Sequence, residues 1–206
     1  MRRSAKWPWR RSRARMASRM LVLALLGLVT TSLPATTTVE QNGAQFPTAI
    51  RLDDHTLSLS GTGVARYRVI FTVYAAALYT PPDTARDKVL DPAVPRRLEI
   101  EYFHEISADD IIRAANTKLA DQLSPERLAA LEPKITRFHG LFQAVSDGDR
   151  YRMDYLPGVG TRLSFNGEPV GAVSGGDFAA AYFGIWLDPG DPLSDRLRED
   201  LLTGTR

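Results

Sequence analysis

Cysteine is absent from the 206 residues of this chain. Its absence excludes disulfide bonds, a thiolate nucleophile and a lipid-modified cysteine behind an export signal. Histidine is scarce: His55, His104 and His139 lie in unrelated contexts without the spacing of metal ligands. The turn "PGVG" at 157–160 lacks the lysine of a phosphate-binding loop, and no serine lies in a nucleophile elbow. We therefore expect no metal, no cofactor and no standard nucleophile.

Acidic residues are missing from residues 1–35, which carry eight of the 26 lysines and arginines. The rest of the chain holds the other 18 basic residues against 24 acidic ones, a net charge of about −6. Nucleic acid binding needs basic residues clustered on the folded surface. We therefore expect no nucleic acid partner.

Long hydrophobic runs are also missing, because the apolar stretch "MLVLALLGLV" covers only residues 20–29. A membrane-spanning helix needs about 20 apolar residues. The basic start followed by this short stretch predicts a secretory signal peptide over 1–35, cleaved after Ala35, and a periplasmic protein with no stable membrane span after cleavage. The alternative is an uncleaved membrane anchor.

The rest of the chain is read as a leader and one domain. Residues 36–48 are polar and threonine-rich without a period, which predicts a flexible leader. Residues 49–206 have no internal repeat and no further linker, and their number suits a single domain.

Alternating apolar residues predict the strands. "TLSLSGTG" reads as a short strand that ends in a glycine turn at 61–63, and residues 66–80 read as one long strand that ends at a pair of prolines. "RRLEIEYFHEI" alternates as a half-buried strand, with Glu99 and Glu101 on its polar face. Two more strands follow, and Asn166 and Gly167 predict a hairpin into a third.

Capping residues predict the helices. Ser107 begins a helix to about Gln122, Ser124 begins a second with a break at Pro133, and Asp177 and Ser194 begin two helices near the C-terminus. Strands, two helices, strands and two helices in this order predict an α+β fold: a large antiparallel sheet with a layer of helices on one face.

A small-molecule cleft is the one candidate site. On a single strand over 66–80, Arg66, Thr72 and Tyr74 would lie on one side, together with apolar residues such as Ile70 and Leu78. If helices cover that side, a mostly apolar cleft with a few hydrogen-bonding groups results. The alternative is that Arg66 is a surface residue at a strand end and Thr72 fills space.

The sequence resembles the chalcone isomerase-like family, in particular its exported bacterial members. The resemblance covers residues 46–204 in a series of ordered segments: "GTGVARYR", "FTVYAAALY", "LEIEYFHEISADDI", "DYLPGVGTRLSFNG" and "GDFAAAYFGIWL…PLSDRLREDLL". It implies an open-faced β-sandwich, in which the ligand cleft lies between a large sheet and a layer of helices.

The resemblance also implies site residues. Plant enzymes of the family close a flavanone ring, with an arginine that stabilises the developing enolate and with threonine, tyrosine and asparagine side chains that assist. The arginine falls on Arg66, with Ala65 as an insertion, and the threonine on Thr72. The positions of the tyrosine and asparagine carry Ile111 and Lys118, and a further hydroxyl near the C-terminal helix is replaced near Ile185.

Three functions follow from these positions, and we rank them. The first is non-catalytic binding of a fatty acid or similar apolar carboxylate, as in family members without the full enzyme site, through Arg66, Thr72 and Tyr74. The second is an isomerase, an intramolecular lyase acting on a phenolic enone with Arg66 and Thr72 alone. The third is a structural or partner-binding envelope protein with Trp186 as an exposed anchor. The sequence assigns no catalytic residue and no oligomeric state.

Overall fold

The computed structural model describes residues 37–67 and 71–205. These residues belong to one compact unit, 35–206, which contains its own hydrophobic cores and can be studied as a separate fragment. The predicted signal peptide at 1–35 lies outside the described residues.

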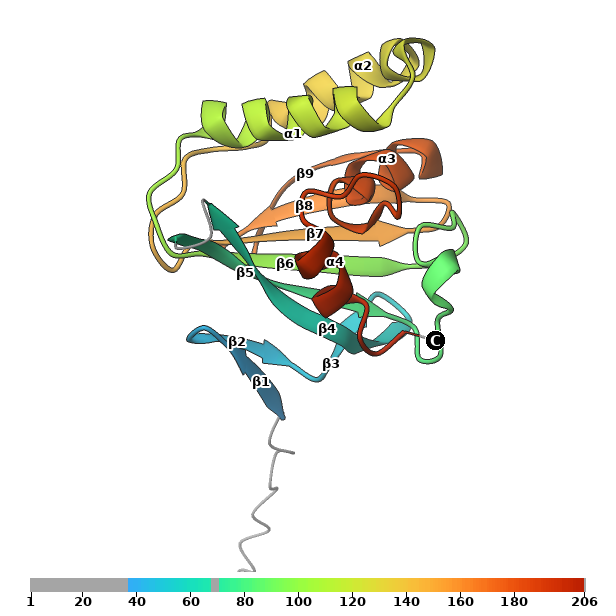
Figure 1. Ribbon diagram of the computed structural model, residues 1–206. Coiled ribbons are helices and arrows are strands. Elements are labelled where there is room, and N and C mark those ends of the chain that lie inside the picture. The colour runs from blue at the N-terminus through green and yellow to red at the C-terminus, as the bar shows by residue number, and fades with distance from the viewer. Residues whose placement is uncertain (1–36, 68–70, 206) are drawn as a thin grey trace, which may run out of the picture. The chain divides into compact units, whose positions relative to one another are not determined.

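The strands alternate buried and polar side chains, as the sequence predicted for several of them. Within the described residues the strands are β1 (Thr38–Gln41), β2 (Ala44–Pro47), β3 (Ala49–Leu52), β4 (His55–Tyr67), β5 (Phe71–Thr80), β6 (Arg96–Tyr102), β7 (Arg150–Leu156), β8 (Gly160–Phe165) and β9 (Glu168–Val173). Strands β3 to β9 form one antiparallel sheet in sequence order, and β1 and β2 form a separate hairpin (Figure 1).

Helices begin where side-chain caps satisfy the free backbone N–H groups. The described helices are α1 (Ala108–Gln122), α2 (Pro125–His139), α3 (Gly176–Leu187) and α4 (Asp195–Leu201), with a short 3-10 helix η1 (Arg86–Lys88). The side chains of Ser107, Ser124 and Ser194 accept hydrogen bonds from the first turns of α1, α2 and α4. Gly175, rather than Asp177, is the N-cap of α3, and Asp177 lies in the first turn.

Pro133 does not break α2, contrary to the prediction. A proline inside a helix removes one hydrogen bond, here the one to the carbonyl of Ala129. Ala129 is exposed, so water can reach that carbonyl, while the buried Ile135 and Phe138 anchor the turns that follow. Packing of the C-terminal half therefore keeps the helix continuous.

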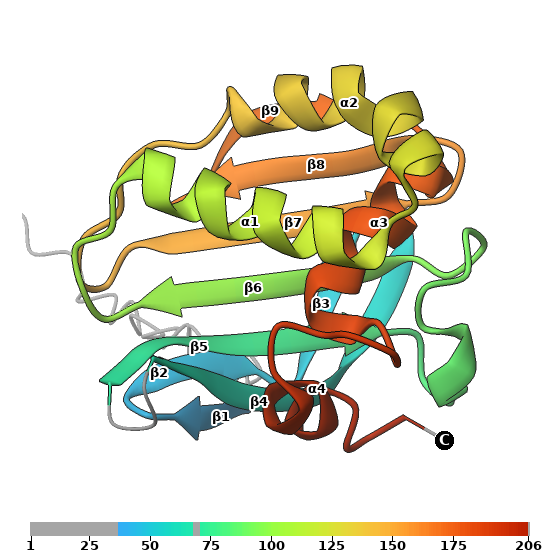
Figure 2. The ribbon, with the colours of Figure 1, turned by 45° about the horizontal axis from the view of Figure 1, so that its top comes forward.

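The main core lies between the sheet and the four helices, which cover one of its faces (Figures 1 and 2). Phe138 of α2 is fully buried there and packs edge-on against Phe178 and Tyr182 of α3, with ring centroids 5.1 and 4.7 Å apart. The α+β class with a helix layer on one face of an antiparallel sheet is confirmed.

A second core lies on the opposite face of the sheet, under the β1–β2 hairpin. Ala44 and Phe46 are fully buried there, and the Arg150 guanidinium lies 5.0 Å from the centre of the Phe46 ring. Arg150 also donates to Glu99 and Glu101, so these two glutamates lie in a covered ion-pair network instead of facing water. The prediction of a flexible leader over 36–48 is therefore wrong for the hairpin residues.

The glycine turn predicted at 61–63 is wrong, because β4 runs straight through it. Helix α4 explains these glycines. A Cβ atom on Gly61 would lie 2.1 Å from the Asp200 carbonyl oxygen, and one on Gly63 would lie 2.7 Å from Leu197 Cδ1. The two glycines let α4 approach the strand closely. The sequence near residues 61–63 alone cannot reveal this contact.

The single strand predicted over 66–80 is wrong as well. Strand β4 ends at Tyr67, β5 begins at Phe71, and the two pair antiparallel, so Arg66 lies opposite Thr72. The segment contains neither glycine nor asparagine, the residues that usually mark such a reversal. Because no such residue interrupts the apolar alternation over 66–80, the sequence pattern predicted one continuous strand there.

The described residues contain no helix long and apolar enough to cross a membrane.

The hydroxyl of Tyr79 provides a test of the second core. Tyr79 is fully buried on β5, and its Oη has no hydrogen-bond partner among the described residues. We expect Tyr79→Phe to leave the free energy of unfolding unchanged or to raise it by up to about 2 kcal/mol, because an unpaired buried hydroxyl is costly. Urea unfolding of the 36–206 fragment measures the change.

Tyr155→Phe is the matched comparison, since Tyr155 Oη donates to the Pro92 carbonyl over 2.7 Å. This variant should lose about 0.5–1.5 kcal/mol. A loss of similar size for Tyr79→Phe would contradict the assignment of an unpaired hydroxyl.

Candidate functional site

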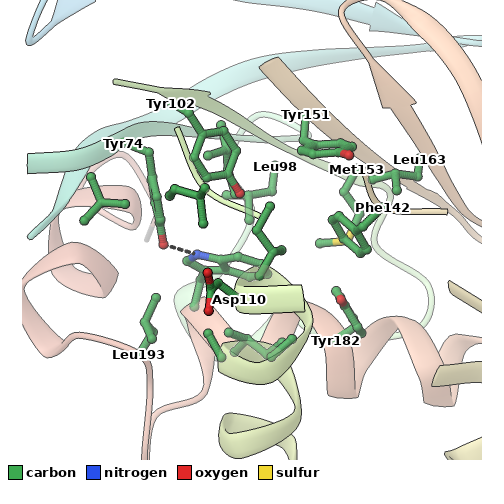
Figure 3. Close-up of a pocket in the computed structure, with 18 residues that line it drawn as sticks. Tyr74, Leu98, Tyr102, Asp110, Phe142, Tyr151, Met153, Leu163, Tyr182 and Leu193 are labelled. Carbon is green, nitrogen blue, oxygen red and sulfur yellow. Dashed lines mark hydrogen bonds between the residues drawn. The ribbon is translucent and has the colours of Figure 1, made fainter. Parts of the chain in front are cut away.

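A cavity of about 160 Å³ lies between the sheet and helices α1 and α3. Strands β5 to β8 form one wall and the two helices form the other, as Figure 3 shows for Tyr74, Tyr102 and Tyr151 on one side and for Asp110 and Tyr182 on the other. The lining residues are Val73, Tyr74, Leu98, Ile100, Tyr102, Ile106, Asp110, Ile111, Ala114, Ala115, Phe142, Tyr151, Met153, Leu163, Tyr182, Ile185, Trp186 and Leu193. The lining is mostly apolar and contains no lysine, arginine or histidine among the described residues.

Periodicity on each element brings these side chains together. Leu98, Ile100 and Tyr102 alternate along β6 on the face that the helices cover. Ile111 and Ala115, four residues apart on α1, face the same space, as the helical period requires. The amphipathic pattern predicted for this helix therefore supplies the second wall.

A β-bulge in β5 adds an extra side chain to the cavity. Ala65 pairs with Tyr74 and Arg66 pairs with Thr72, which leaves Val73 without a partner residue on β4. At such a bulge two residues of one strand face one residue of the other. Val73 and Tyr74 accordingly both line the cavity.

Four tyrosines surround the cavity and differ in their hydrogen bonds. Tyr74 Oη accepts a hydrogen bond from Trp186 Nε1 over 2.8 Å. Tyr151 Oη accepts from the backbone N–H of Gln143 and donates to the carbonyl of the same residue. No hydrogen bond joins the hydroxyl of Tyr102 or of Tyr182 to another described residue, and both hydroxyls point into the cavity (Figure 3).

The tyrosines are neutral hydrogen-bonding groups at ordinary pH. Burial raises the pKa of Tyr74, Tyr102 and Tyr151 above that of a free phenol, and it raises the pKa of Tyr182 well above it. None of them can serve as a base near pH 7. The cavity therefore offers phenol hydroxyls and apolar surface.

Among the described residues Asp110 is the one carboxylate in the lining, and it lies at the rim. Its side chain is 53% exposed and forms an ion pair with Arg113. Hydrogen bonds from the Ser107 hydroxyl and the Arg113 guanidinium lower the pKa of Asp110, so it stays ionised. The rim on this side carries the Asp110–Arg113 ion pair, while Leu193, 39% exposed, makes it apolar elsewhere.

The predicted ligand contacts divide between the cavity and the far side of the sheet. Tyr74 lines the cavity, whereas Arg66 and Thr72 are not among its lining residues. Ala65 packs toward the helices, and alternation therefore directs the exposed Arg66 to the opposite face. Thr62 of the same strand bonds to Gln41 of β1 on that face, as this alternation requires.

The other positions implied by the resemblance have separate roles. Ile111 and Ile185 both line the cavity. Lys118 instead forms an ion pair with Asp191, with 2.7 Å between Nζ and the carboxylate. Trp186 is not the exposed anchor of the third hypothesis, because it is partly buried and donates to Tyr74.

Sequence reasoning missed Tyr102, Tyr151 and Tyr182 as site residues. Tyr102 and Tyr151 stand on the apolar side of strongly alternating strands, so a rule that flags polar-tipped aromatics on a core face would have found them. Tyr182 lies in an almost wholly apolar helix, where periodicity carries no information about direction.

Comparison with protein families identifies the chain. A family model described as chalcone isomerase-like matches residues 38–203. This chain belongs to the chalcone isomerase-like family. The resemblance to the family as a whole is confirmed, and the match includes the β1–β2 hairpin that was taken for a leader.

Solved structures confirm the fold. A fatty-acid binding protein of Arabidopsis thaliana superimposes with a TM-score of 0.65 at 14% sequence identity, over 81% of this chain and 96% of that chain. At 14% identity this likeness shows the fold alone, which is the open-faced arrangement of a sheet and a layer of helices. A search of curated protein sequences found no match.

Proposed function

We propose that the domain is a non-catalytic binding protein that holds a fatty acid, or a similar small apolar carboxylic acid, in the cavity between sheet and helices. The observation that carries this proposal is the lining itself: apolar side chains, four neutral tyrosines and one carboxylate at the rim. Such a lining favours binding of an apolar molecule. Family membership and the fatty-acid binding function named for the Arabidopsis structure support the same reading.

The size of the cavity limits what it can enclose. A dry cavity of about 150 Å³ accommodates benzene, and the cavity here measures about 160 Å³. About six carbon atoms therefore fit inside, and a longer chain must extend across the rim beside Leu193 or push the helices outward. We expect affinity to rise with chain length while apolar surface of the rim is still being covered.

The isomerase reading has less support. Catalysis by enolate stabilisation requires a cation or strong donors at the developing charge. Arg66 is exposed and does not line the cavity, and no other described arginine or lysine does. The raised pKa values of the tyrosines also make them weak acids.

Bound ligand should be identified directly. The 36–206 fragment is purified under mild conditions, its small molecules are extracted, and their masses are measured. We expect a fatty acid or a related apolar acid to co-purify, and to be lost when the cavity is filled by substitution. An empty protein that cyclises a chalcone would overturn the proposal in favour of the isomerase.

We also propose that the protein is exported and works in the periplasm. The support is the basic stretch and the short apolar run within residues 1–35, followed by the acidic domain. Mass measurement of the protein from cell fractions tests this. We expect a periplasmic species that begins at Thr36, and a full-length species retained in the membrane would show an uncleaved anchor instead.

A further inference from the structure

The cavity contains two hydroxyls for which the protein offers no partner. Tyr102 is 6% exposed and Tyr182 is 1% exposed, and no other described residue bonds to either hydroxyl. The two residues come from opposite walls, β6 and α3, and their hydroxyls face the same space (Figure 3). If a hydrocarbon chain filled this space, both hydroxyls would be cut off from water without a partner, which is unfavourable for each.

Charge in and around the cavity disfavours a carboxylate. In the part of the chain that the structure describes, the titratable groups that line it are Asp110 of α1, Tyr74 of β5, Tyr102 of β6, Tyr151 of β7 and Tyr182 of α3, and none is cationic. Burying a carboxylate without a cation is strongly unfavourable.

The arginine that pairs with Asp110 does not supply a cation inside the cavity. Arg113 is 73% exposed and is not a lining residue, and its guanidinium already pairs with Asp110 over 2.8 Å. A carboxylate bound through Arg113 would lie outside the cavity and compete with that pair.

We propose that the ligand binds with its polar end inside the cavity and uncharged, with Tyr102 and Tyr182 as its hydrogen-bond partners. This inference rests on the proposed binding function and narrows it: the acid is taken up in its protonated form, and neutral relatives such as primary amides and alcohols bind at least as well. A phenol hydroxyl can donate to a carbonyl oxygen and accept from an acid O–H or an amide N–H. The hydrocarbon chain then leads outward past the rim.

The pH dependence of binding tests the charge of the head group. Over about pH 6 to 8 Asp110 stays ionised and the tyrosines stay neutral, because the pKa of the first is lowered and those of the others are raised. Among the ligand and the described groups that line the cavity, only the ligand changes: its acid pKa is about 4 to 5, so its protonated fraction falls as the pH rises. His139, which packs against Tyr182 from behind, has its pKa lowered by burial and is therefore neutral over the upper part of this range. Affinity for octanoic acid should therefore fall about tenfold per pH unit. Affinity for octanamide, which has a similar shape and no charge, should stay constant.

Calorimetric titration of the 36–206 fragment with octanoic acid and octanamide separates the outcomes. A flat profile for the acid, or an amide that binds more weakly than the acid at about pH 8, overturns the inference and leaves the binding function standing. Failure of both ligands to bind at any pH contradicts the proposed function itself.

Hydroxyl deletion tests the placement of the head. Tyr102→Phe and Tyr182→Phe each remove one hydrogen bond and should weaken octanamide binding about two- to tenfold. Tyr79→Phe, which removes a buried hydroxyl on the far side of the sheet, should leave binding unchanged. Unchanged binding in both cavity variants would overturn the placement, and thermal unfolding of each variant shows that the fold is retained.

Discussion

Ala115→Phe is expected to abolish ligand binding while the domain stays folded. Ala115 lies on the inner face of α1, is 8% exposed and lines the cavity. The substitution adds a ring the size of benzene to a cavity of about 160 Å³, which holds little more than that. We expect affinity for octanamide to fall at least about 100-fold, equivalent to about 2.7 kcal/mol, in the same calorimetric titration.

Ala120→Phe is the matched control, with the same change on an exposed position of the same helix. It should bind as the unchanged fragment does. If Ala115→Phe retains full affinity and melts as the unchanged fragment does, the ligand does not occupy this cavity. Filling the cavity adds apolar contacts, so we expect little loss of stability from this variant.

Asp154→Ala is expected to lower the free energy of unfolding by about 3–5 kcal/mol, because it leaves a buried charge without its partner. Asp154 of β7 is 6% exposed, and Arg97 of β6, its cross-strand partner, is 8% exposed. Arg97 donates from both Nε and Nη2 to the two carboxylate oxygens, with Nη2 2.8 Å from Oδ2. Urea unfolding of the 36–206 fragment measures the loss.

Two further variants test whether burial of the ion pair causes the expected loss of stability. Asp177→Ala removes an exposed ion pair with Lys134 and should cost no more than about 1 kcal/mol. The double change Arg97→Met with Asp154→Leu removes both charges and should recover much of the stability. An Asp154→Ala loss no larger than that of Asp177→Ala would contradict the account of this face of the sheet.

Local signals in the sequence were enough for the elements whose structure is locally determined. The hairpin at Asn166 and Gly167 forms as predicted, with positive φ angles of 49° and 89° at the two residues. Serine caps at 107, 124 and 194 place three helix starts correctly, because the hydrogen bond involved spans only three residues. The alternation of apolar and polar residues in β6 and β7 also predicted these strands, because the helices cover one face of each.

Features that depend on distant contacts could not be read in this way. The spacing of Gly61 and Gly63 is set by α4, about 140 positions later in the chain, and a local reading took it for a turn. The β1–β2 hairpin is mostly polar in sequence, and its two inward residues, Ala44 and Phe46, are covered by the sheet and by Arg150. A local sequence pattern shows neither the packing of α4 on the two glycines nor the cover over Ala44 and Phe46.

The structure has a cavity where the cleft was predicted, but only one of the three predicted contact residues lines it, and ligand binding there stays a prediction. A cleft between sheet and helices with Tyr74 in its wall agrees with the structure. Arg66 and Thr72 were placed beside Tyr74 by counting along a single strand, and the reversal between Tyr67 and Phe71 removes that basis. Arg66 and Thr72 lie opposite each other on the paired strands β4 and β5. Neither lines the cavity, and their contact with a ligand stays a prediction.

Quenching of Trp186 by a brominated acyl chain tests the central claim most directly. Trp186 is the one tryptophan of the 36–206 fragment, it lines the cavity, and its Nε1 donates to Tyr74. Bromine quenches indole fluorescence only at close contact, so a bromo-octanamide bound in the cavity should quench most of the Trp186 emission at saturation, whereas octanamide itself should not. Calorimetric saturation by the brominated ligand without loss of Trp186 emission would show that the ligand lies elsewhere, and would contradict the account.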